Sequence, residues 1–154
     1  AIGTMSTSEV KEFAISPYID SIKFGSAYLK VGNVIQDRVT ISANATANLT
    51  SAQIRIGYIT STSASATVLT LPTGTDLGSA LGATAGTTLD FFIDNTAGAN
   101  TVTIAVNTNA ILSALAVANG ASFGLLTIPS GVTGQARFTI MFSSATAYTI
   151  TRTG

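Results

Sequence analysis

Two aspartates, Asp90 and Asp94, are the candidates for chemistry in a long stretch of the chain that is otherwise almost free of charge. A pair of carboxylates can hold a divalent cation or divide acid and base work in a hydrolysis. Four residues apart on one strand, however, they lie about 13 Å from each other, whereas calcium ligands lie about 2.4 Å from the ion. We therefore expect no site made by these two residues alone. The simpler interpretation is a polar face, or a partnership within or between subunits with Arg55, Arg137 or Arg152.

Phe92 lies between these aspartates, on the face of the strand that their alternation makes polar. A large aromatic side chain in that position is either exposed to a partner or covered by another part of the protein. Cover by a second sheet or by the N-terminal segment is the simpler explanation, because sheets commonly pack in layers. A platform for a ligand is the alternative. The tyrosines are scattered without a repeated spacing and do not define a sugar-binding surface: Tyr18, Tyr28, Tyr58 and Tyr148.

The usual catalytic side chains are missing, because the chain contains neither cysteine nor histidine. Disulfides, thiolate metal sites, thiol nucleophiles and imidazole bases are thereby excluded. Serine and threonine lack a partner base in the main part of the chain, and no nucleophile elbow or phosphate-binding loop is present. A hydrolase using Asp90 or Asp94 would need two carboxyl groups roughly 5 to 10 Å apart in one cleft. We expect no enzyme, and no catalytic, cofactor-binding or metal-binding residues.

The charge distribution also limits the partners. Only 9% of the 154 residues are charged, the formal net charge is zero, and no Lys or Arg cluster exists to bind a phosphate backbone. No charged residue lies between Asn95 and Ala136, yet polar residues interrupt each apolar run well before the roughly 20 residues of a membrane-spanning helix. We expect neither nucleic acid nor a membrane as a partner.

Short runs alternate apolar and polar residues with a period of two, as strands with one buried face do. In one of them Leu89, Phe91 and Ile93 share the apolar face. Residues 95–100 are rich in turn formers and predict a hairpin between this run and the next. Residues 111–118 fit a strand or a helix, and their neighbours favour a strand. The other expected strands are residues 58–61, 66–71, 102–106, 123–128, 137–142 and 148–151.

Two short helical turns are expected among these strands. Thr50 has the position of an N-cap, and Gln53 can reach back to the backbone N–H of the cap, with Gly57 as the end of the turn. A second turn runs from Thr75 through Leu81 and ends at Gly82.

These elements predict an all-β fold, namely a jelly-roll-like antiparallel β-sandwich with a short N-terminal extension. At 15.6 kDa the chain has room for one ordinary domain. We assign it to residues 49–154, and residues 1–48 to an arm with short strands, because most of the charged residues precede residue 55. Residues 1–4 are interpreted as an expression remnant before Met5, with proteolytic maturation as the competing explanation, and no secretory signal is visible.

Several short segments resemble virion-surface proteins of bacteriophages, in particular small β-sandwich or jelly-roll head-decoration (cement) proteins and related fibre domains. The resemblance covers about two thirds of the chain and is carried by residues 49–60, Leu71-Pro72-Thr73, Asp94-Asn95-Thr96, Asn100-Thr101-Val102-Thr103 and residues 147–152. It implies a trimer seated on a capsid lattice, with the major capsid protein or another virion component as partner.

The expected function is therefore non-enzymatic: a virion structural protein on the capsid surface, acting as a decoration or cement protein that stabilises the head by oligomeric packing. The charged N-terminal segment would dock on the shell or clasp a neighbouring subunit. The alternative is a receptor- or glycan-binding tip domain of a phage fibre or an adhesin. The presence of a cluster of exposed aromatic side chains beside amide groups would favour that alternative.

Overall fold

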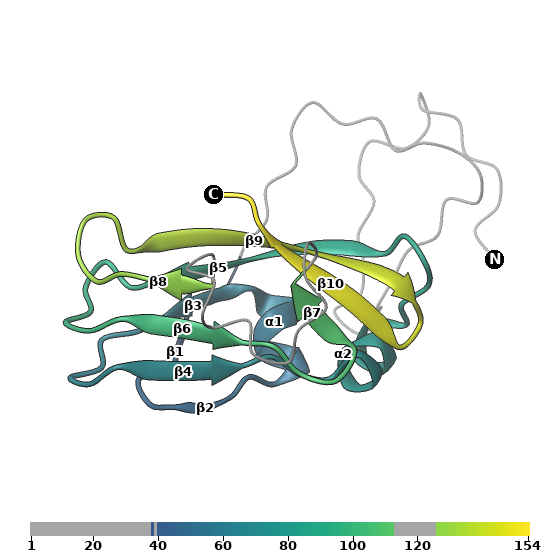
Figure 1. The fold of residues 1–154 in the computed structure, drawn as a ribbon, viewed down its shortest axis with the longest axis horizontal. Helices are drawn as coiled ribbons and strands as arrows, with labels where there is room; N and C mark the ends of the chain where they lie inside the picture. The colour runs from purple at the N-terminus through teal and green to yellow at the C-terminus, as the bar shows by residue number, and fades with distance from the viewer. Residues whose placement is uncertain (1–37, 39, 113–125) are drawn as a thin grey trace, which may run out of the picture. The chain divides into compact units, whose positions relative to one another are not determined.

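A computed structural model describes residue 38, residues 40–112 and residues 126–154 (Figure 1). The residues from Asp37 to Gly154 form one compact unit. Its described part contains ten strands and two short helices. In chain order these are β1 (Thr40–Ser42), β2 (Ala47–Asn48), α1 (Ser51–Ile56), β3 (Tyr58–Thr60), β4 (Thr67–Thr70), α2 (Gly74–Leu81), β5 (Thr88–Asp94), β6 (Val102–Ala105), β7 (Ala110–Leu112), β8 (Thr127–Ile128), β9 (Gln135–Ser144) and β10 (Ala147–Arg152).

The strands form two sheets, and the chain crosses between them repeatedly. The six-stranded sheet has the order β1-β3-β5-β9-β10-β7, and the four-stranded sheet has the order β2-β4-β6-β8. From β1 to β6, successive strands along the chain belong to alternate sheets. Strands β1, β3 and β5 are therefore parallel neighbours in the six-stranded sheet, and β2, β4 and β6 are parallel neighbours in the four-stranded sheet. The side chains stack in register, with Ile41, Ile59 and Ile93 in one row of the six-stranded sheet.

The expected antiparallel jelly roll is wrong. The sheets are mixed: β1, β3 and β5 are parallel, as are β2, β4 and β6, and β7 is parallel to β10. Antiparallel pairing joins β9 to β5 and β10, and β8 to β6. The physical reason is the crossover connection. The chain leaves a strand of the six-stranded sheet, forms a strand of the other sheet and returns through a helix to the end at which it began. Its next strand in the six-stranded sheet therefore runs parallel to the previous one. The prediction that the fold is mostly β is nevertheless correct.

The expected hairpin around residues 95–100 is also wrong, because β5 and β6 belong to different sheets. The side chain of Asn95 directs this crossing. It is fully buried, and its amide nitrogen lies 2.8 Å from the carbonyl oxygen of Asn100, 3.3 Å from that of Ile128 and 3.0 Å from that of Pro129. The end of β5 is thereby tied to the end of β8 in the other sheet, which a local hairpin would not do.

The core lies between the two sheets and is almost wholly apolar. Along β9 the buried residues alternate with outward residues, as the period of two predicted, and β5 and β6 do the same. Phe91 stacks on Phe138, and Phe142 packs against Tyr148, both with ring centroids 5.2 Å apart. The largest fully buried side chains are Tyr148, Phe91, Phe138, Phe142, Ile54, Ile59, Leu69, Leu71, Leu77, Ile93, Ile104 and Leu112.

Helix α1 forms as its sequence predicted. The Thr50 side chain accepts a hydrogen bond from the Gln53 backbone, and the Gln53 side chain accepts one from the Thr50 backbone, which completes a capping box. Gly57 ends the helix with φ at 80°, a left-handed conformation that glycine adopts without strain. Ile54 points into the core and fixes the helix against the sheets.

Helix α2 is also confirmed, with Thr73 as its N-cap and Gly82 as its C-cap. One face of this helix approaches the turn between β9 and β10 so closely that side chains have no room. A Cβ added at Gly74 would collide with the carbonyl oxygen of Thr146, and one at Gly78 with that of Ala145. The two glycines therefore allow the helix to pack directly on backbone.

Other predicted strands are found where the structure describes them. Residues 58–61 and 66–71 contain β3 and β4. Of residues 111–118 only the first two are described, and they belong to β7, while β8 forms the end of the expected strand 123–128. Strands β1 and β2 lie within the segment 1–48 but belong to the compact unit, where β1 pairs with β3 and β2 with β4; residues 1–37 lie outside the described part. No helix of the described residues is long and apolar enough to cross a membrane.

Candidate functional site

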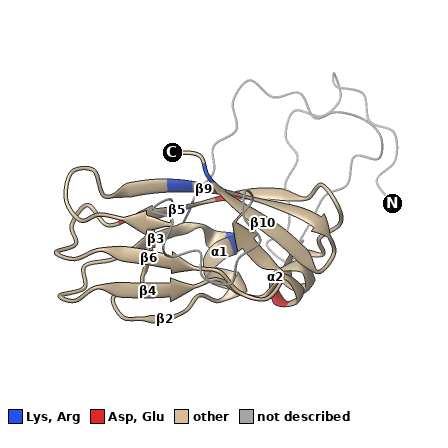
Figure 2. Cartoon of the chain, in the orientation of Figure 1, with Lys and Arg blue, Asp and Glu red and all other residues tan. Residues whose placement is uncertain are grey.

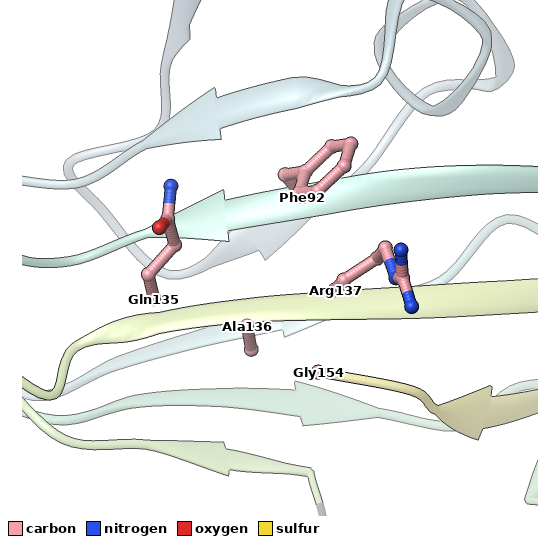
Figure 3. Close-up of a pocket in the computed structure, with 5 residues that line it drawn as sticks. All are labelled: Phe92, Gln135, Ala136, Arg137 and Gly154. Atoms are coloured by element: carbon pink, nitrogen blue, oxygen red, sulfur yellow. The ribbon is translucent and has the colours of Figure 1, made fainter.

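A shallow groove lies on the outer face of the six-stranded sheet, opposite to the core. Its volume is about 250 Å³, and we call it the Phe92 groove (Figure 3). Register brings its members together, because Phe92 on β5 pairs with Tyr58 on β3 and with Arg137 on β9. Figure 3 shows Phe92 and Gln135 projecting to the same side of the sheet. The residues that line the groove are Phe92, Gln135, Ala136, Arg137 and Gly154.

The ring of Phe92 is half-buried and held by two neighbours. The ring of Tyr58 lies beside it, with centroids 6.1 Å apart, and the guanidinium carbon of Arg38 lies 5.3 Å from its centroid. Arg38 is itself anchored, since its Nη1 donates to the carbonyl oxygen of Asp90 at 2.9 Å. Gly57 provides the space for this guanidinium, because a Cβ there would collide with it. Phe92 is thus a fixed platform rather than a loose surface side chain.

A directed chain of hydrogen bonds runs beside the ring. The Tyr58 hydroxyl donates to Asp94 Oδ2 at 2.7 Å, and Gln135 Nε2 donates to the Tyr58 oxygen at 3.4 Å. Hydrogen bonds from the side chain and backbone of Thr96, and then from Tyr58, lower the pKa of Asp94. The hydrogen bond to Asp94 in turn raises the pKa of Tyr58. The carboxylate is therefore ionised near neutral pH and accepts the hydrogen bond from the hydroxyl group, which fixes the direction of each bond.

Arg137 is the cationic wall of the groove. Its Nε donates to the hydroxyl of Thr153 at 3.2 Å and its Nη2 to the Thr153 carbonyl oxygen at 3.3 Å. Both acceptors are neutral, so the positive charge of the guanidinium is oriented but not neutralised by them. The N–H groups of Nη1 and the second N–H of Nη2 are not used by Thr153 and are suited to donate to a carboxylate.

Asp90 and Asp94 lie on the same outer face of β5, but they have separate hydrogen-bond partners. Asp90 accepts a 2.7 Å hydrogen bond from the Thr139 hydroxyl, and Asp94 accepts from Tyr58 and Thr96. In the described part of the chain both accept from hydroxyl groups, and Asp94 also accepts from the Thr96 backbone N–H, whereas the sequence suggested arginines as partners. Among the described residues no cluster of three His, Cys, Asp or Glu side chains is suitable for a metal ion.

Of the two covers expected for Phe92, the N-terminal segment contributes and the second sheet does not. The second sheet covers the opposite face of β5, and Phe92 is partly covered instead by Tyr58 and by Arg38, which comes from the segment 1–48. Tyr148 is buried in the core, and Tyr18 and Tyr28 lie outside the described residues. Gln135 was not among the residues predicted for the site. No local signal points to it, since its place beside Tyr58 depends on the pairing of β5 with β9.

The four-stranded sheet presents a second surface, and its described strands contain no Lys, Arg, Asp or Glu. We call it the uncharged face (Figure 2). Val68, Thr103 and Thr127 form one row across β4, β6 and β8, and Thr70 and Ala105 form the next. Val68 is 38% exposed, and the others are partly exposed. Arg152 lies at the margin, where it donates to the Thr127 carbonyl oxygen.

Comparison with known proteins identifies no relative. No protein-family model, no curated protein and no solved structure matches the chain. The resemblance to phage head-decoration proteins therefore stays a prediction, and the function must be argued from the two surfaces.

Proposed function

We propose that this chain is a non-enzymatic structural protein of a bacteriophage virion, a decoration protein that associates with copies of itself through the uncharged face. The proposal rests on one observation above all: the outward side chains of the four-stranded sheet are small or β-branched and carry no charge in the described rows. A surface without charge has no like-charge repulsion against its own copy, and a closed ring of copies buries it repeatedly.

The physical mechanism is apolar burial. Each Å² of apolar surface removed from water contributes about 25 cal/mol, and symmetry repeats the gain at every contact. Val68 provides the largest outward side chain of the face, while Thr103 and Thr127 add methyl groups beside hydroxyls that water or a partner can satisfy. Arg152 at the margin fits the polar rim of such an interface. In this proposal the trimer sits on the capsid surface and adds contact area between shell subunits.

Charge insertion on the two sheets tests the interface. We expect Val68→Lys with Thr103→Lys to convert the assembled protein into monomers, because six buried ammonium groups in a trimer would lack partners. Met141→Lys is the matched control, since Met141 is 54% exposed on β9 of the other sheet. Light scattering measures the mass of each variant, and circular dichroism confirms the fold. Equal masses for the double variant and the wild type would exclude this face as the interface.

The location on a virion has its own test. Gold-labelled antibodies against the chain, applied to virions of the phage that encodes it, are expected to decorate the head surface. Labelling confined to the tail or fibres would contradict a head-decoration role. It would favour the alternative of a fibre tip domain.

A further inference from the structure

We infer that the Phe92 groove binds a sugar unit that carries a carboxylate, of the uronic-acid or sialic-acid class. The groove lies on the six-stranded sheet, whereas the uncharged face belongs to the other sheet, so this binding does not rest on the proposed self-association. Three different groups line it: an aromatic ring, a carboxamide and a guanidinium (Figure 3).

The aromatic ring accounts for the sugar. The face of a pyranose ring presents several C–H bonds with positive character, which pack favourably on the negative face of an aromatic ring. Arg38 lies over one face of Phe92 and Tyr58 lies beside it, so the ring is held in one place and little side-chain entropy is lost when a ligand packs on the part that lines the groove. At about 250 Å³ the groove is slightly smaller than the roughly 300 to 1,000 Å³ of sites for drug-sized ligands, which suits a single sugar unit.

The carboxamide accounts for the hydroxyl groups. Because the Tyr58 O–H donates its hydrogen bond to the ionised Asp94, the Tyr58 oxygen can only accept from Gln135, which must turn its nitrogen toward it. The Oε1 atom of Gln135 then points away from Tyr58 and can accept from a sugar hydroxyl, while the second N–H of the amide can donate to another. Adjacent hydroxyl groups of a sugar offer this combination of donor and acceptor.

The guanidinium accounts for the carboxylate. Arg137 is oriented by two neutral acceptors of Thr153, so its charge remains available to a ligand in the groove. A polyanion such as a nucleic acid is disfavoured, because Asp90 and Asp94 lie on the same face of β5 as Phe92. A sugar with one carboxylate can pack on Phe92, form hydrogen bonds with Gln135 and pair its charge with Arg137.

Nuclear magnetic resonance titration tests the inference, with D-glucuronate as the probe and D-glucose and inorganic phosphate as comparisons. We expect glucuronate to shift the side-chain signals of Gln135 and of Arg137 Nε–H and to bind about tenfold more tightly than glucose, because only its carboxylate pairs with the guanidinium. Arg137→Gln should reduce the affinity for glucuronate to that for glucose. Phe92→Leu, which keeps apolar bulk but removes the ring face, should weaken both sugars. Arg55→Gln, on the exposed end of α1, is the matched control and should change neither.

Three results would contradict the inference in whole or in part. Equal affinities for glucose and glucuronate would show that the carboxylate of the ligand is not recognised. Tighter binding of phosphate than of glucuronate would indicate a simple anion site. The absence of shifts up to roughly 10 mM glucuronate, ten times a weak Kd of 1 mM, would overturn it entirely. A monomeric protein that binds glucuronate would contradict the proposed assembly alone, which separates the two proposals.

Discussion

The Tyr58 hydroxyl donates a 2.7 Å hydrogen bond to the Asp94 carboxylate, and this bond links two residues that lie 36 positions apart in the sequence. It joins β3 to β5 on the outer face of the six-stranded sheet, directly beside the half-buried ring of Phe92. The same bond sets the orientation of Gln135. The protonation state of Asp94 therefore affects both the stability of this face and the arrangement of the groove.

Asp94 should make the protein sensitive to acid. Its folded pKa is lowered by Thr96 and Tyr58, so the stabilisation is complete above its ordinary pKa of about 3.9 and is lost as the pH falls through the lower folded value. We expect the melting temperature of the wild type to fall more steeply below about pH 4 than that of Asp94→Asn, whose neutral side chain does not titrate. Calorimetric scans between neutral and acidic pH measure the two slopes. Parallel slopes would show that Asp94 contributes nothing to the acid response.

Tyr148 should be a strong contributor to core stability. Its side chain is 1% exposed, and its hydroxyl donates to the carbonyl oxygen of Pro72 at 2.6 Å. Tyr148→Phe leaves that carbonyl oxygen without this donor and should lower the free energy of unfolding by about 1 to 3 kcal/mol. Tyr58→Phe removes a hydroxyl on the outer face, where water can replace it, and should cost about 1 kcal/mol or less. Urea denaturation compares the two variants, and a larger loss in Tyr58→Phe would refute this ranking.

Asn95 should tolerate no change to aspartate. Its buried nitrogen donates toward the carbonyl oxygens of Asn100, Ile128 and Pro129, so Asn95→Asp replaces a donor by an oxygen that faces other oxygens. We expect a loss of about 3 kcal/mol or more in the free energy of unfolding. Asn44→Asp is the control, because Asn44 is exposed and its Oδ1 accepts from the Thr62 backbone, a role that a carboxylate keeps. Similar denaturation midpoints for both variants would contradict the bridging role of Asn95.

The features of the fold that depend on residues close together in the sequence are correctly predicted. The alternation of Phe91 and Phe138 with polar residues fixes which face is buried, and Thr50 with Gln53 fixes the start of α1. The direction of pairing is not available from the same pattern, because parallel and antiparallel strands share the period of two. The turn-forming residues after Asp94 suggested a hairpin, but the buried amide of Asn95 bonds to carbonyl groups more than 30 positions away.

The candidate site, too, could be predicted from the sequence only in part. Phe92 was recognisable as unusual, since a large aromatic side chain lay between two aspartates. Its neighbours Gln135 and Arg137 reach it only through the pairing of β5 with β9, and Arg38 reaches it from another segment. Local sequence reveals the exceptional residue, whereas strand register selects its companions.

The mass of the wild-type chain in solution tests the central claim most directly. At micromolar concentration, light scattering should give about three times 15.6 kDa, and the value should be the same at about 0.15 M and 1 M salt. The invariance follows because the uncharged face provides no ion pairs at its centre for salt to screen. A monomer of 15.6 kDa at both salt concentrations, or a trimer that dissociates in high salt, would contradict assembly through this face.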